Sequence, residues 1–188
     1  MTSNPISLKH HFLIAMPNLD GGGFSHTVTY ICEHNDQGAM GLVINRPTEL
    51  QLSEILDELE IEPTQPQVAD HAIYAGGPVQ TNMGFILHRD PRSWDSTLEV
   101  DDEVRLTTSK DILQSIADGK GPESCLIALG YSGWSPGQLE QELADNCWLT
   151  APARSEIIFS MPDEQRLDAA AALLGIKLDQ LSRTPGHA

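Results

Sequence analysis

Apolar and β-branched residues occur in this chain as short runs bounded by turn residues, and this pattern limits the folds that the chain can form. Runs of four to six such residues lie at 12–16, 27–32, 41–44 and 125–129. Runs of this length are typical of buried strands, and each is far shorter than the ~20 residues that cross a membrane as a helix. The chain is therefore expected to fold around a β-sheet.

Further patterns place helices between the strands. Residues 52–59 have leucine and isoleucine at helical spacing, with Thr48 or Ser53 as the cap, and a second helix follows Ser109. Shorter strands are expected at 73–75, 84–88, 98–100, 104–107 and 157–159, and further helices at 135–146 and 167–174. Because hairpins come first and helices alternate with strands afterwards, the predicted fold class is α/β (α+β mixed). It has a central mixed β-sheet with early hairpins and flanking helices, in a single domain over 1–188.

The charge of the chain restricts its partners. There are 27 acidic residues against 11 basic residues, which gives a net charge of −16. Proteins gain most of their non-specific affinity for DNA from Lys and Arg, and no basic stripe occurs here, so direct nucleic-acid binding is not expected. The acidic surface suits an unidentified protein partner. The run at 12–16 is too short for a signal sequence, so no membrane partner is expected. The three cysteines form no paired motif, and we therefore predict a cytoplasmic location.

Four stretches, taken together in order and spacing, resemble one protein family. They are residues 12–17 with Asp20 and Phe24, residues 38–47, residues 76–79 with Leu87 and His88, and residues 129–140. These stretches are similar to those of the bacterial AlgH/YqgE family, and the resemblance extends over nearly the whole chain. It implies an α/β fold with a mixed sheet and a smaller α+β lobe. It implies no established biochemical activity, although a regulatory role, sometimes labelled transcriptional, is attached to some members.

The segment Gly130-Tyr131-Ser132-Gly133 follows a predicted strand and precedes a predicted helix, as the nucleophile elbow of a hydrolase does. The fifth residue of that motif is glycine, whereas this chain has Trp134, and the resembling family more often has alanine at Ser132. We therefore interpret the segment as a tight turn rather than as a serine nucleophile. Ser135 is expected to cap the next helix, with Pro136 at its first position, and the amides there could bind an anion.

A ligand pocket is the second hypothesis for this region. The glycines at 76–77 could bind a phosphate or carboxylate, although the sequence favours a sharp structural turn, and Arg46 could hold a carboxylate. Trp134 is either an internal packing anchor or, as we hypothesise, a pocket wall together with Tyr131. The residues predicted to bind a ligand are Asn45, Arg46, Gly76, Gly77, His88, Tyr131, Trp134, Gln138 and Glu140.

Cysteine and histidine residues offer little further chemistry. Cys32 and His34 share a face of a predicted strand, so Cys32 is the candidate reactive thiol, the alternative being that it is a small buried apolar residue. Cys125 lies in an apolar strand and is expected to belong to the core. The histidines lack the spacing of a metal site, so we predict no metal and no cofactor.

Three classes of function remain open. The first is a soluble, non-catalytic regulatory or protein-interaction module, which the lack of a base–nucleophile pair favours. The second is a small-molecule or anion-binding protein, or an enzyme, that uses the predicted pocket. The third is a DNA-binding regulator, which the acid-rich helices make the least favoured.

Overall fold

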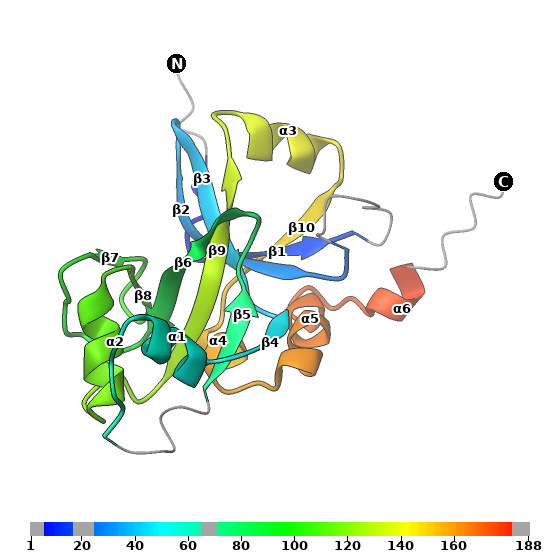
Figure 1. Cartoon of the computed structure of the whole chain (residues 1–188). Coiled ribbons are helices and arrows are strands. Elements are labelled where there is room, and N and C mark those ends of the chain that lie inside the picture. The colour runs from blue at the N-terminus through cyan, green and yellow to red at the C-terminus, as the bar shows by residue number, and fades with distance from the viewer. Residues whose placement is uncertain (1–5, 17–24, 65–70, 182–188) are drawn as a thin grey trace, which may run out of the picture. The chain divides into compact units, whose positions relative to one another are not determined.

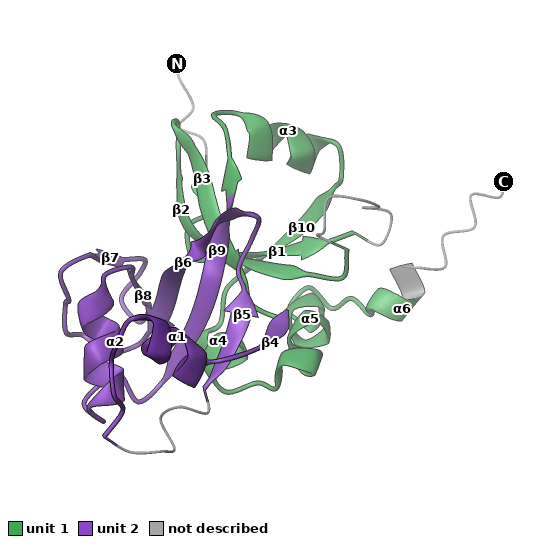
Figure 2. Cartoon of the chain, viewed as in Figure 1, with its two compact units in different colours: residues 1–45, 133–188 green, residues 46–132 purple. Residues whose placement is uncertain are grey.

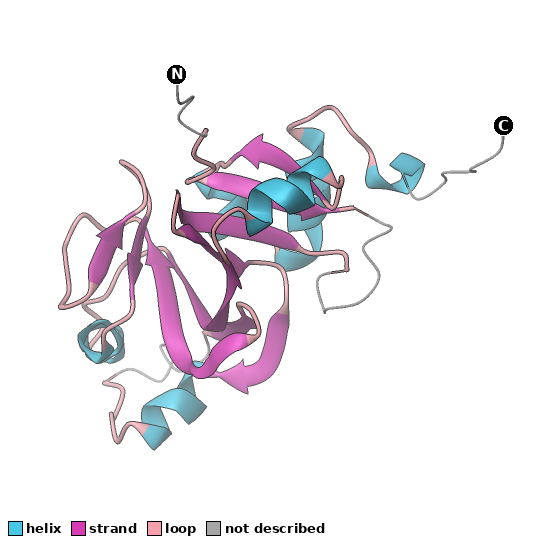
Figure 3. Ribbon diagram, turned by 90° about the horizontal axis from the view of Figure 1, so that it is seen from above, coloured by secondary structure: helices cyan, strands magenta, loops and turns pink. Residues whose placement is uncertain are grey.

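The computed structural model describes residues 6–16, 25–64 and 71–181, and the chain forms two compact units (Figure 2). Unit 1 contains residues 1–45 and 133–188, and unit 2 contains residues 46–132. Each unit has both strands and helices. Figure 3 distinguishes the helices from the strands by colour. The single domain predicted over 1–188 stays a prediction. No helix of the described segments has the length and apolar character that crossing a membrane requires.

Unit 1 is built on an antiparallel sheet with the strand order β10-β1-β2-β3 (Figure 1). Its strands are β1 (His11–Ala15), β2 (Val28–Asn35), β3 (Gly38–Val43) and β10 (Trp148–Pro152). The predicted hairpin of β2 and β3 is confirmed, with Asn35 opposite Gly38 across the turn. Pro17, Asp20 and Phe24, which belong to one of the four family-like stretches, lie outside the described residues.

The helices in the described part of unit 1 are α3 (Gln138–Ala144), α4 (Ser155–Phe159), α5 (Asp163–Ala172) and α6 (Leu178–Leu181). The strand predicted at 157–159 is wrong, because these residues form the second half of α4. A run of three apolar residues fits one helical turn as well as a strand, so its pattern cannot separate the two. The sequence analysis did not predict strand β10, in which apolar and polar residues do not alternate regularly.

The predicted cap of α3 is also wrong. The N-cap is Gly137, in the left-handed conformation, rather than Ser135. Ser135 and Pro136 instead form a turn in which the Gln138 N–H donates to the Ser135 carbonyl over 2.9 Å. The helix consequently begins two residues later than the sequence pattern indicates.

Unit 2 contains a mixed sheet, which confirms the predicted α/β class. Strand β5 pairs in parallel with β9, whereas the β4–β5, β6–β9, β6–β8 and β7–β8 pairs are antiparallel. The strands are β4 (Pro47–Gln51), β5 (Ala72–Ala75), β6 (Val79–His88), β7 (Thr97–Glu99), β8 (Arg105–Thr107) and β9 (Cys125–Trp134), the last two residues of β9 belonging to unit 1.

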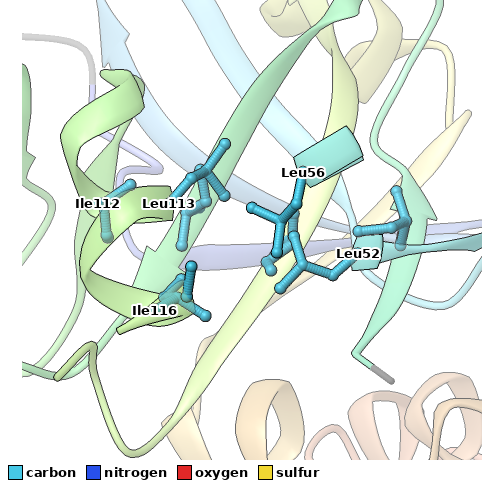
Figure 4. Close-up of a cluster of buried hydrophobic side chains, with 9 residues drawn as sticks. Leu52, Leu56, Ile112, Leu113 and Ile116 are labelled. Atoms are coloured by element: carbon cyan, nitrogen blue, oxygen red, sulfur yellow. The ribbon is translucent and has the colours of Figure 1, made fainter. Parts of the chain in front are cut away.

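Two helices of unit 2, α1 (Leu52–Glu58) and α2 (Lys110–Ala117), bury their apolar faces in one cluster. In Figure 4, Leu56 of α1 and Leu113 of α2 extend toward one another. Ser109 is the N-cap of α2, as predicted. The predicted cap of α1 is wrong, because Gln51 occupies the N-cap position and donates its N–H to the Glu54 carboxylate over 2.9 Å.

Candidate functional site

The residues predicted to bind a ligand are divided between the two units. Unit 1 holds Asn45, Trp134, Gln138 and Glu140, and unit 2 holds Arg46, Gly76, Gly77, His88 and Tyr131. A single ligand pocket formed by all of these residues stays a prediction. The contacts that each residue makes within its own unit are described below. Most of these contacts support the fold.

The segment 130–133 continues strand β9, so its interpretation as a tight turn is wrong, and the nucleophile elbow that the sequence argued against is not formed. Gly130 is in the left-handed conformation, and its lack of a Cβ lets the backbone of residues 77–81 pass close to it. The Ser132 side chain is buried, and its hydroxyl donates to the Gly76 carbonyl over 3.3 Å. The Gly76 N–H in turn donates to the Leu129 carbonyl. The Ser132 hydroxyl is therefore bonded to a carbonyl rather than to a base, and the Gly76 amide is already bonded and not open to an anion.

His88, Asn45 and Arg46 contribute to hydrogen bonds inside their units. His88 is fully buried, its Nε2 lies 2.7 Å from the Thr107 hydroxyl, and burial lowers its pKa, which favours the neutral imidazole. Asn45 accepts the Val28 N–H and donates to the His26 carbonyl, which fixes the beginning of β2. The Arg46 carbonyl accepts the Ala75 N–H.

Trp134 is a packing anchor in unit 1, so the hypothesis of a pocket wall is wrong. Its side chain is 6% exposed and packs in a cluster with Leu13, Ile31 and Leu139. The Trp148 ring lies edge-on to it at 6.1 Å. Tyr131, its proposed partner, lies in unit 2, where its ring contacts Phe85 at 5.4 Å.

One carboxylate of α3 holds both of these buried tryptophans. Glu142 Oε1 accepts the indole N–H of Trp134 over 3.2 Å and that of Trp148 over 3.0 Å. The other oxygen accepts the Gln138 side-chain amide over 2.9 Å. Gln138 also accepts the Ser135 N–H, so that amide is already bonded and is not available to an anion. Sequence reasoning missed this role of Glu142, because the contact joins residues of different elements.

Glu140 pairs with His34 on the neighbouring strand. The His34 Nδ1 accepts the Leu8 N–H over 2.8 Å, so the proton of the neutral ring lies on Nε2, which is 2.5 Å from the Glu140 carboxylate. The hydrogen bond from His34 lowers the pKa of Glu140 below its ordinary value of 4.5. The pair thus connects α3, β2 and the segment that precedes β1.

A lowered pKa of Glu140 predicts a pH-dependent contribution to stability. A carboxyl whose pKa is lower in the folded state stabilises the fold above its unfolded pKa, and this contribution is lost as the pH falls through the folded value. We expect Glu140→Gln to lower the free energy of unfolding at neutral pH and to have a progressively smaller effect below about pH 4.5. Denaturant unfolding at a series of pH values measures this, with the exposed Glu123→Gln as the control. An effect of Glu140→Gln that does not vary with pH would contradict the prediction.

Cys32 does not behave as the reactive thiol that the sequence predicted. The pairing of β2 with β3 shifts between Ile31 and Glu33, which places a bulge at Cys32 and breaks the alternation of faces. Ile31 packs beneath α3 and His34 bonds to α3, whereas Cys32 is fully buried with its thiol 3.8 Å from the Tyr30 carbonyl. Burial raises the Cys32 pKa far above its ordinary value. The alternative of a small buried apolar residue is therefore correct.

We expect Cys147 to be alkylated first in the native protein. Its side chain is partly exposed, although burial and the neighbouring Glu142 and Asp145 raise its pKa. Cys125 is half-buried and packs against the core cluster of unit 2, and burial raises its pKa to about 11. Mass spectrometry after limited alkylation measures the order, and labelling of Cys32 ahead of Cys147 would refute it.

A pocket that the sequence did not predict lies within unit 2. It has a volume of about 350 Å³ and is lined by parts of α1, α2, β6 and β9. Its lining is mostly apolar and includes Ile55, Leu59, Met83, Leu113, Ile127 and Leu129. Each of these residues belongs to an ordinary helix or strand pattern. The pocket results from how the elements pack, so the sequence carries no local signal for it.

The edge of the pocket combines exposed apolar and charged side chains. Leu50 and Met83 are 39% and 37% exposed. Met83 ends a bulge of β6, because residues 80–83 lie between the two parts of β6 that pair with β9. Glu54, Glu58 and Lys110 complete the edge. None of the predicted ligand-binding residues lines this pocket. Within the described segments, no three His, Cys, Asp or Glu side chains are grouped to hold a metal ion.

Comparisons with known proteins agree with the resemblance seen in the sequence. The AlgH-like family model matches residues 12–179. The chain is 55% identical over 187 residues to the UPF0301 protein AlgH of Pseudomonas aeruginosa, covering 99% of this chain and 98% of that protein. It is 52% identical over 180 residues to a UPF0301 protein of Nitrosococcus oceani, covering 96% of each. These names state neither a reaction nor a ligand.

Two solved structures share the fold. The solution structure of AlgH from Pseudomonas aeruginosa matches with a TM-score of 0.81 and 54% identity over 100% of both chains. The crystal structure of a protein from Corynebacterium diphtheriae matches with a TM-score of 0.71 over 98% of this chain and 95% of the other, at 19% identity. The family model, the curated relatives and the first of these structures agree, and the chain therefore belongs to the AlgH-like family.

Proposed function

We propose that the protein is a non-catalytic regulatory or protein-interaction module whose partner places an apolar group in the unit 2 pocket. The observation that carries this proposal is the pocket, a hollow of about 350 Å³ lined mainly by leucine, isoleucine and methionine. Ligand pockets in proteins are mostly apolar and have a few polar groups that orient the ligand. The exposed Leu50 and Met83 extend the apolar surface outside the hollow, where a bound partner would cover them.

The same geometry favours binding over catalysis. Ser132 is buried against a carbonyl, His88 is buried beside Thr107, and Cys32 is buried with a raised pKa. An activated nucleophile needs a neighbouring base or a lowered pKa, and none of these three side chains has the contacts that would provide one. A cytoplasmic location belongs to the same proposal, and the free cysteines support it.

Filling the pocket is the direct test. A Cβ at Gly84 would meet only the Ile86 Cδ1, at 3.8 Å, so a longer side chain has room to enter the hollow. We expect Nile red, a neutral dye that fluoresces in apolar surroundings, to bind the wild type, and Gly84→Leu to abolish binding while circular dichroism stays unchanged. Thr81→Leu adds the same side chain to the neighbouring bulge but outside the pocket, and should bind the dye like the wild type. Equal binding by all three proteins would refute the proposal.

We also propose that the protein does not bind DNA directly, and the net charge of the chain supports this proposal. We expect no binding to duplex DNA at physiological salt, because a net charge of −16 repels phosphates. A gel-shift titration measures this. A sequence-specific, salt-sensitive shift in the low micromolar range or tighter would contradict it.

A further inference from the structure

We infer that the pocket of unit 2 binds a basic segment of a protein partner, one apolar side chain entering the hollow while Lys or Arg pairs with Glu54 and Glu58. This inference rests on the proposed function and names the class of partner. It is carried by the charges at the edge of the pocket together with the apolar lining.

Glu54 and Glu58 lie one helical turn apart on α1 and both line the pocket, so they lie on the same face of the helix. Glu58 has no ion-pair partner in the part of the chain that the structure describes. Within the described residues, the Glu54 carboxylate accepts one hydrogen bond, from the Gln51 N–H. Both carboxylates are therefore available to cations of a partner whose apolar side chain lies in the hollow.

The surroundings of the pocket are acidic as well. From Glu49 to Glu62 the chain has six acidic residues and no basic one. Unit 2 has sixteen acidic residues against six Lys and Arg, a net charge of −10. Such a surface attracts cationic partners over distance and repels anionic ones.

One feature that could favour an anionic ligand, the beginning of α2, already has an acidic side chain beside it. The pocket edge includes Lys110 and the beginning of α2, whose amides would attract a carboxylate or phosphate. Asp111 occupies that position. Its carboxylate accepts the Asp95 N–H and the Ser109 hydroxyl, and hydrogen bonds lower its pKa although burial opposes this. A fatty-acid-like ligand in the pocket would thus meet Glu54 and Glu58 against the single Lys110.

Two labelled peptides test the charge of the partner. Both carry leucine at every third or fourth position, and one has lysine and the other glutamate elsewhere. We expect the Leu/Lys peptide to bind wild-type protein in a fluorescence anisotropy titration, and the Leu/Glu peptide and laurate not to bind. Gly84→Leu should abolish binding of the Leu/Lys peptide. Glu54→Gln/Glu58→Gln should weaken it about fivefold, as expected for two exposed ion pairs.

A matched control removes the same charge elsewhere in unit 2. Asp102 and Glu123 are exposed and do not line the pocket, so Asp102→Asn/Glu123→Gln should change the affinity less than about twofold. An equal effect of the two double variants, or equal or tighter binding of the Leu/Glu peptide or laurate, would overturn the inference. If Nile red binds in a Gly84-dependent way and the Leu/Lys peptide does not bind, the inference fails and the proposed function stands. If neither probe binds, both fail.

Discussion

Replacing Trp134 with alanine is expected to lower the free energy of unfolding by about 3–5 kcal/mol. The indole is 6% exposed and contacts the Trp148 ring edge-on, so its removal loses apolar contacts and leaves a cavity. It also removes one of the two indole donors that Glu142 Oε1 accepts. Since small proteins are stabilised by only about 5–15 kcal/mol, this loss is a large share of the total.

Denaturant unfolding of Trp134→Ala against the wild type measures the loss, and an unchanged m-value would show that the variant still folds to a comparable extent. Trp134→Phe is the matched control, because phenylalanine keeps an aromatic ring beside Trp148 and loses the hydrogen bond to Glu142. It should cost less than half as much as alanine. A loss below about 1 kcal/mol for Trp134→Ala would show that the side chain does not anchor the core of unit 1.

Much of the fold could be predicted because its local signals are strong. The apolar runs at 12–16, 27–32 and 125–129 became β1, β2 and β9, and Ser109 caps α2. The strand predicted at 157–159 is wrong because a run of three apolar residues fits the period of a helix as well as that of a strand. β9 continues past Leu129 to Trp134, where Tyr131 pairs with Val79 of β6 and the side chains of Ser132 and Trp134 are buried.

The candidate site was predicted less well, because its properties come from contacts between distant residues. A single bulge in β2 separates Cys32 from His34, and no residue pattern announced it. Trp134 was correctly singled out as unusual, but only packing decides whether an indole is a wall or an anchor. The unit 2 pocket is the space that remains where α1, α2 and the sheet pack together, and no sequence motif predicts such a space.

The second large effect is expected from Gly130→Ala, which should lower the free energy of unfolding by about 3 kcal/mol or more. Gly130 has a φ of 77°, and a Cβ there would overlap the Gly77 carbonyl and approach the Val79 carbonyl oxygen to 3.1 Å and the Thr81 Cα to 3.3 Å. All three are backbone atoms, so no rotamer change relieves the overlap and the strands must move. The left-handed conformation costs about 1–2 kcal/mol, and the overlap adds about 1–3 kcal/mol.

Gly137→Ala separates these two contributions. Gly137 has nearly the same φ of 78°, but a Cβ there meets nothing within 4 Å. Its replacement should therefore cost only about 1–2 kcal/mol, which is the cost of the conformation alone. Denaturant unfolding of both variants gives the difference, which measures how closely residues 77–81 pass over β9. Equal losses would mean that this close passage does not exist in solution, and that Gly130 is required only for its backbone conformation.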